Sequence, residues 1–158
     1  MRKTFLCAAA LAAAVAFAVA VADAGARDTV PLKGKDTFHA RVVGGSGSSI
    51  ETADSGSGTS THLGDFTMTA SETVDFASMT VTNGTVTLTA ANGDTVSGTY
   101  GGTILPGLTG YLVSGPITGG TGRFADATGT IVFKGTFDPA TGNGSDVIGG
   151  SISTVGSR

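Results

Sequence analysis

The sequence predicts an all-β protein, built as one eight-stranded antiparallel up-and-down β-barrel. After the first 26 residues the chain is dominated by Thr, Gly, Ser and Val, and no ten-residue stretch shows apolar residues at helical spacing. Apolar and polar residues alternate instead, as in residues 66–69 and 85–89, which is the period of a half-buried strand. This regular alternation argues against disorder, which a Gly- and Ser-rich composition would otherwise suggest.

Eight strands separated by short turns are expected along the chain. They cover residues 35–43, 49–61, 65–76, 79–90, 94–104, 110–118, 127–137 and 145–154. Asn92-Gly93 predicts a tight hairpin, because both residues tolerate the positive φ that such a turn requires. An Asn-Gly pair also lies between Val81 and Val86, which have opposite parity, and this predicts a bulge.

Closure of these strands into a barrel is favoured over a sandwich of two sheets, which is the alternative. Hairpin-linked antiparallel strands can close and so remove their exposed edges. Glycines inside the expected strands permit the strong coiling that closure needs. They are Gly98, Gly101, Gly102, Gly115, Gly135, Gly149 and Gly150. The interior of such a barrel either is filled by side chains or holds one small ligand.

The first 26 residues have the pattern of a secretory signal peptide. Arg2 and Lys3 form a positive region, an Ala- and Val-rich apolar run follows to residue 22, and small residues suited to cleavage occur at positions 20–26. A retained membrane anchor is the alternative, since about 18 apolar residues could nearly span a bilayer. Removal of the signal leaves a single barrel domain, residues 27–158, which is then secreted or periplasmic and free of the membrane.

Charge and cysteine content narrow the classes of partner. Without Arg2, Lys3 and Asp23, the nine Lys/Arg and twelve Asp/Glu become seven and eleven, so the exported domain carries about four net negative charges. That balance provides no basic footprint for nucleic acid. Cys7 lies in the signal, so the barrel has no disulfide and depends on packing for its stability.

A glycine-punctuated corner at residues 117–129 connects the sixth and seventh expected strands. Gly120 and Gly122 remove Cβ where the chain needs positive φ or close backbone approach. One helical turn is expected after them, with Phe124 as the only large apolar side chain able to hold it to the core. A corner without chemistry is the first interpretation, and an anion site at its backbone amides, assisted by Arg123, is the second.

The corner resembles the signature of a known barrel family. Residues 119–129 follow the pattern Gly-Gly-Thr-Gly-x-Phe-x-x-Ala-x-Gly, which is similar to a block in allene oxide cyclases, plant dirigent proteins and many small secreted bacterial proteins. Residues 61–67 (Thr-His-Leu-Gly-Asp-Phe-Thr) and 89–94 resemble runs that precede this block in the bacterial proteins. The resemblance implies an allene oxide cyclase-like barrel, an apolar cavity and assembly into trimers.

The expected interior contains few large apolar side chains, because the chain has no Trp and few Leu. Its candidate residues are Phe38, Phe66, Phe76, Phe124, Phe133, Phe137, Tyr100, Tyr111, Leu88, Val96, Ile104, Leu112, Val132, Ile148 and Ile152. Either small residues pack this interior tightly, or it leaves an apolar pocket. The residues expected to contact a bound ligand are Phe66, Tyr100, Tyr111, Phe133 and, at the barrel mouth, His62. The alternative for His62 is a strand-end side chain that bonds a neighbouring carbonyl or carboxylate.

Groups suited to catalysis are scarce. Two histidines 23 residues apart cannot complete a zinc site alone, and no serine has a nucleophile-elbow pattern. Glu51, Glu72 and Arg41 match no catalytic block of the family, so no catalytic residue, cofactor or metal is assigned. The sequence therefore predicts a barrel that binds a small apolar or phenolic ligand, uncharged or with one charged end at the mouth. The first alternative is an isomerase or cyclase that confines a reactive lipid or phenolic substrate, and the second is a structural envelope or matrix protein.

Overall fold

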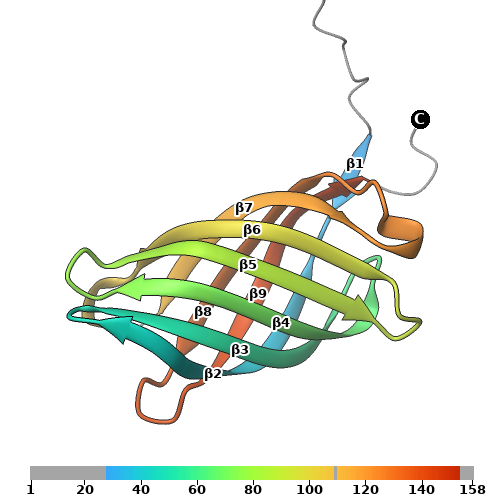
Figure 1. Cartoon of the computed structure of the whole chain (residues 1–158). Helices are drawn as coiled ribbons and strands as arrows, with labels where there is room; N and C mark the ends of the chain where they lie inside the picture. Colours follow the sequence, from blue (N-terminus) through green and yellow to red (C-terminus); the bar gives the residue numbers. More distant parts are fainter. Residues whose placement is uncertain (1–27, 109, 154–158) are drawn as a thin grey trace, which may run out of the picture.

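A computed structural model describes residues 28–108 and 110–153, which form one closed β-barrel (Figure 1). The predicted signal peptide falls on residues outside the described ranges, and no helix within those ranges is long and apolar enough to cross a membrane. The strands are β1 (Thr29–Pro31), β2 (Gly34–Ser46), β3 (Ser49–Ser60), β4 (Gly64–Asp75), β5 (Thr80–Ala90), β6 (Thr95–Ile104), β7 (Tyr111–Gly120), β8 (Gly129–Phe137) and β9 (Asn143–Ser153). Two short 3-10 turns, η1 (Pro106–Leu108) and η2 (Gly122–Phe124), flank β7.

The barrel closes because its last strand pairs on both sides. Each strand from β2 to β8 is antiparallel to the next one along the chain, and β9 pairs with both β8 and β2. The predicted all-β class and the eight-stranded antiparallel barrel are thereby confirmed. The short β1 is an addition that the sequence did not predict, and it pairs with the end of β9 from Ser151 to Ser153. A segment of three residues that ends in a proline is too short to show the alternation by which the other strands were predicted.

The predicted hairpin and bulge are both present. Gly93 has a φ of 88° in the turn between β5 and β6, and its N–H donates to the Ala90 carbonyl at 2.9 Å. The register of β5 against β6 shifts between Val81 and Gly84, and Asn83 between them has a φ of 55°. Because of this bulge, residues of both parities in β5 face the interior.

The glycine-rich corner is tied to the β5–β6 hairpin. Phe124 is only 4% exposed and belongs to the core, as predicted. The Arg123 backbone N–H donates to Asp94 Oδ2 at 3.4 Å, and Arg123 Nε lies 3.6 Å from the same oxygen. The Thr121 hydroxyl accepts the Thr95 backbone N–H at 3.0 Å. The carboxylate of Asp94 therefore lies at the backbone amides where the second interpretation of the corner placed a bound anion.

The barrel interior is packed at one end and hollow at the other. The packed end consists of apolar side chains that are at most 5% exposed: Leu32, Leu63, Phe66, Leu88, Ala90, Val96, Ile117, Phe124, Ala127, Ile131, Ile148 and Ile152. Two residues expected inside do not face inward, since Leu112 is 46% exposed and Val132 is half-buried. Leu112 follows Tyr111 in the same strand, and adjacent strand residues point to opposite faces, so Val113 takes the inward position instead.

Candidate functional site

The hollow end of the barrel is a cavity of about 530 Å³, to which every strand from β2 to β9 contributes. The connection between β8 and β9, residues 138–142, borders its mouth together with Arg41 and Val42 of β2, whose side chains are exposed. Apolar side chains form much of the inner surface: Met68, Ala70, Val74, Val81, Val86, Ile104 and Val113. The volume falls within the range of about 300–1,000 Å³ that is usual for small-molecule sites.

Five rings from four strands form what we call the aromatic wall: Phe38, Tyr100, Tyr111, Phe133 and Phe137. Tyr111 lies between Phe38 and Phe137, with ring centroids 6.3 Å apart in both pairs. Tyr100 meets Phe133 edge to face at 5.9 Å. Such edge contacts fix the orientations of the rings and leave a flat apolar surface for another aromatic group.

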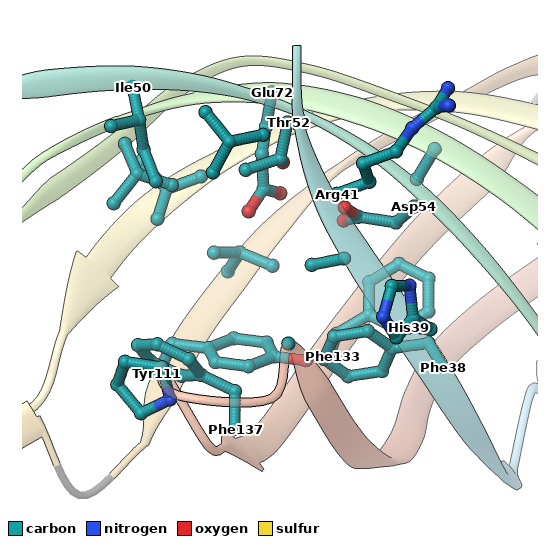
Figure 2. Close-up of a pocket in the computed structure, with 18 of the residues that line it drawn as sticks. Phe38, His39, Arg41, Ile50, Thr52, Asp54, Glu72, Tyr111, Phe133 and Phe137 are labelled. Atoms are coloured by element: carbon teal, nitrogen blue, oxygen red, sulfur yellow. The ribbon is translucent and has the colours of Figure 1, made fainter.

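Three carboxyl groups line the same cavity, and we call them the acid cluster: Asp54 of β3, Glu72 of β4 and Asp146 of β9. The Tyr100 hydroxyl donates to Glu72 Oε2 at 2.6 Å, and the Tyr111 hydroxyl donates to Asp146 Oδ1 at 2.5 Å. Glu72 and Asp54 lie across the cavity from Tyr111 and Phe133 (Figure 2). Two phenol–carboxyl pairs therefore connect the aromatic wall to the acid cluster.

Burial sets the protonation of the acid cluster. It raises the pKa of Asp54 to about 7, and the negative charge of Glu72 adds to the rise. Burial also raises the pKa of Glu72, against the opposing effect of the hydrogen bond from Tyr100. Asp146 faces Asp36 across the β2–β9 pair, and burial raises the pKa of both carboxyls. Asp54 thus exchanges its proton near neutral pH.

Two buried oxygen atoms that line the cavity make no hydrogen bond within the described chain. They are Thr52 Oγ1 and Asp54 Oδ1. Thr52 is only 6% exposed and lines the cavity. The two tyrosines stay protonated, because burial and then the neighbouring carboxylate charges raise the pKa of both hydroxyls. The cavity thus offers hydrogen-bond acceptors that no described group of the protein uses.

Gly135 makes the Tyr111–Asp146 pair possible. Its backbone faces both side chains, and a Cβ there would lie 2.7 Å from the Tyr111 hydroxyl and overlap Asp146 Oδ1. Gly144 makes room for the Phe38 ring in the same way. Residues without a side chain therefore alternate with large inward ones, and this alternation positions the rings and the carboxyl groups.

Comparison with known proteins supports the architecture. The structures of two pterocarpan synthase dirigent proteins are similar to this chain. GePTS1 has a TM-score of 0.55 and 18% sequence identity, and the similarity covers 88% of this chain and 96% of GePTS1. PsPTS1 has a TM-score of 0.52 and 17% identity, and the similarity covers 80% of this chain and 96% of PsPTS1. The fold is that of a dirigent barrel. No family model matches the sequence, and no curated protein matches it. At this identity the likeness establishes the fold, which agrees with the family resemblance at that level.

The dirigent-type barrel brings together three of the five residues expected to contact a ligand. Tyr100, Tyr111 and Phe133 line the cavity within the aromatic wall. Phe66 does not, because it fills the packed end at 4% exposure. His62 does not either: it is exposed in the turn between β3 and β4, where its Nε2 lies 3.2 Å from the Pro31 carbonyl oxygen. That contact is the alternative that the sequence left open for His62.

The sequence interpretation missed two members of the acid cluster. It singled out neither Asp54 nor Asp146, although the alternation places both inside. Asp54 has the parity of Ile50 and Thr52 in β3, and Asp146 has the parity of Ile148 in β9. Parity alone could have identified both carboxyls as inward-facing. Within the described ranges, no group of three or more His, Cys, Asp or Glu side chains is placed to hold a metal ion.

Proposed function

We propose that the barrel binds a small aromatic or phenolic molecule in its cavity. The observation that carries the proposal is a cavity of about 530 Å³ with five aromatic rings along one side. A flat aromatic ligand gains edge-to-face and offset contacts with Tyr111 and Phe133 beyond the burial of its apolar area. A hydroxyl group on such a ligand can bond to Asp54, whose Oδ1 has no partner within the described chain.

The similar solved structures and the carboxyl groups of the cavity favour phenolic ligands over other aromatic ones. The two similar solved structures named above are pterocarpan synthase dirigent proteins, and the similarity covers 88% and 80% of this chain. The carboxyl groups of the cavity suit a neutral hydroxyl better than a carboxylate, because a buried anion beside Glu72 and Asp54 would be left without a counter-charge.

Thermal melting with neutral probes tests the proposal. Naphthol, phenylphenol or dodecanol, at about 100 times its dissociation constant, should stabilise the folded protein by about 2.7 kcal/mol. For a domain of this size that raises the melting temperature by roughly 5–15 °C. Ala70 lines the cavity, so Ala70→Leu should reduce the shift, whereas the same substitution at the exposed Ala91 should not. An unchanged melting temperature with every probe would leave a purely structural role for the barrel.

An acid-assisted isomerase or cyclase is the second candidate, and Asp54 is the residue that favours it. A carboxyl with a pKa of about 7 can donate a proton to a substrate at neutral pH and take one back. Confinement in an apolar cavity would steer the reactive species. Incubation with phenolic alcohols and analysis of the products by mass spectrometry tests this activity. Asp54→Asn should abolish conversion and retain naphthol binding, while equal conversion by the variant would remove Asp54 from the mechanism.

We also propose that the barrel acts outside the cytoplasm after removal of its signal peptide. The order of positive, apolar and small residues in positions 2–26 supports this. Protein recovered from the cell envelope or the medium should begin between Asp23 and Arg27, as measured by intact-mass and N-terminal analysis. Recovery of a form that still begins at Met1, in the membrane fraction, would contradict the proposal.

A further inference from the structure

The cavity has two sides of different chemistry. Glu72, Thr52 and Asp54 lie along one side, and the rings of Tyr111, Phe133 and Phe38 face them from the other (Figure 2). A ligand that fills the space between them must meet carboxyl groups with one part and aromatic carbon with another. This arrangement restricts the ligand more than an apolar cavity alone would.

The positive charge available to the acid cluster lies at the mouth. Among the described residues that line the cavity, Arg41 and His39 are the basic ones, and both side chains are exposed. The acidic groups are deeper: Asp146 is 6% exposed, and Asp36 behind it is 5% exposed. A buried carboxylate without a counter-charge is unfavourable, so the site as a whole attracts a cation.

The unpartnered oxygens of the cavity add a second, independent requirement. Thr52 Oγ1 is buried and makes no hydrogen bond within the described chain, and neither does Asp54 Oδ1. An ionised carboxylate only accepts hydrogen bonds, and a hydroxyl can accept as well as donate. An ammonium group presents up to three donors from one centre and carries the charge that the acid cluster lacks.

The aromatic wall suits the same group. A cation within about 6 Å of a ring centroid is attracted by the negative face of the ring, and this attraction strengthens where water is excluded. Tyr100 of the aromatic wall is hydrogen-bonded to Glu72 at 2.6 Å, so an ammonium bound to Glu72 lies beside this tyrosine. The described acidic side chains do not converge on a point that would hold a metal ion, so the larger organic cation fits the site better.

We infer that the natural ligand is an aromatic molecule with a basic nitrogen, whose protonated amine binds Asp54, Glu72 and Thr52 while its ring packs on the aromatic wall. The inference rests on the proposed function and specifies its ligand class. It differs from the sequence expectation, which placed any charged end of the ligand at the mouth.

A matched set of indoles tests the amine directly. Tryptamine, tryptophol and indole acetate share one ring system and differ in carrying a cation, a hydroxyl or an anion. The chain has no Trp, so the protein contributes no indole fluorescence of its own. The fluorescence of each compound therefore reports its own binding. At about pH 8 we expect tryptamine to bind at least about tenfold more tightly than tryptophol, and indole acetate to bind most weakly.

Charge-removing variants assign the effect to the acid cluster. Glu72→Gln and Asp54→Asn keep side-chain size, and an amide oxygen still accepts a hydroxyl, so each should weaken tryptamine binding by at least about fivefold more than it weakens tryptophol binding. Glu51→Gln is the matched control, since Glu51 is exposed in β3 and does not line the cavity. It should change neither affinity.

The outcomes separate the inference from the proposed function. If tryptophol binds as tightly as tryptamine, or if both inward variants leave tryptamine affinity unchanged, the amine is wrong and the neutral-ligand function stands. If none of the indoles binds while naphthol raises the melting temperature, the inference fails alone. If the indoles and the neutral probes all fail to bind, both are overturned.

Discussion

The free energy of unfolding should fall by several kcal/mol as the pH rises from about 5 to about 8. Asp54 has an ordinary pKa of 3.8 when exposed and about 7 in the folded barrel, because burial disfavours its charged form. Burial raises the pKa of Asp36, Asp146 and Glu72 in the same direction. At pH values between the unfolded and the folded pKa of each carboxyl, the folded state holds a proton that the unfolded chain releases. The free energy of unfolding therefore decreases as the pH rises through this interval.

The size of this loss in the free energy of unfolding follows from the change in pKa on folding. A pKa that rises from 3.8 to about 7 on folding corresponds to on the order of 4 kcal/mol for Asp54 alone, before water at the mouth reduces it. The extra stability is fully present below about pH 4 and is lost by about pH 7. Hydrogen bonds lower the pKa of Asp75 and Asp138, so the stability that these two carboxylates contribute is lost below about pH 4, and the protein is most stable at about pH 4.

Urea denaturation at a series of pH values measures this dependence. Asp54→Asn should flatten the curve, since the amide has no charge to bury, and should stabilise the protein at about pH 8. Asp65→Asn is the matched control on the exposed face of β4 and should leave the slope unchanged. A wild-type stability that is constant or that increases between about pH 5 and about pH 8 would mean that the acid cluster is solvated rather than buried.

The fold was predictable because alternation with a period of two is a local property. Each of the eight predicted strands overlaps an observed one, and the parity change between Val81 and Val86 correctly indicated the bulge. The interior was less predictable. Whether an inward ring lines a cavity or fills a core depends on the volume that its neighbours in space occupy. Gly135 of β8 provides room for Tyr111 of β7, and Gly144 of β9 provides room for Phe38 of β2.

The acid cluster was missed for a different reason. Acids are rarely buried, so the sequence interpretation did not consider Asp54 and Asp146 as inward-facing residues. Their positions in the alternation of β3 and β9 nevertheless indicate that both face inward, and this alternation is the stronger indicator here. The error over Leu112 came from the same neglect, since Tyr111 and Leu112 are adjacent in one strand and cannot both face inward. Inward acids on an otherwise apolar face therefore point to a site more directly than the aromatic residues do.

Gly120→Val in the glycine-rich corner should destabilise the protein by about 3 kcal/mol. The backbone of Gly120 is packed against the start of β6, and a Cβ there would overlap the Thr95 carbonyl oxygen and lie 3.1 Å from the Phe124 carbonyl oxygen. That Thr95 oxygen also accepts the Thr121 N–H at 3.0 Å, so the overlap cannot be relieved without breaking the corner. Because backbone atoms block the new side chain on two sides, a rotamer change gives no relief.

Two other glycines make the prediction specific. Gly122 has a φ of 57°, which costs a residue with a Cβ about 1–2 kcal/mol. Its Cβ would also overlap the Asp94 side chain, which can move more easily than backbone atoms can but would lose its contacts with Arg123. Gly149 in β9 has no atom within 4 Å of a Cβ, so Gly149→Val should change stability by less than about 1 kcal/mol. Urea denaturation should therefore rank the valine variants Gly120, Gly122 and Gly149 in order of decreasing loss. A Gly120→Val protein as stable as Gly149→Val would show that the corner opens without cost, and that Phe124 rather than the close backbone contact holds it to the barrel.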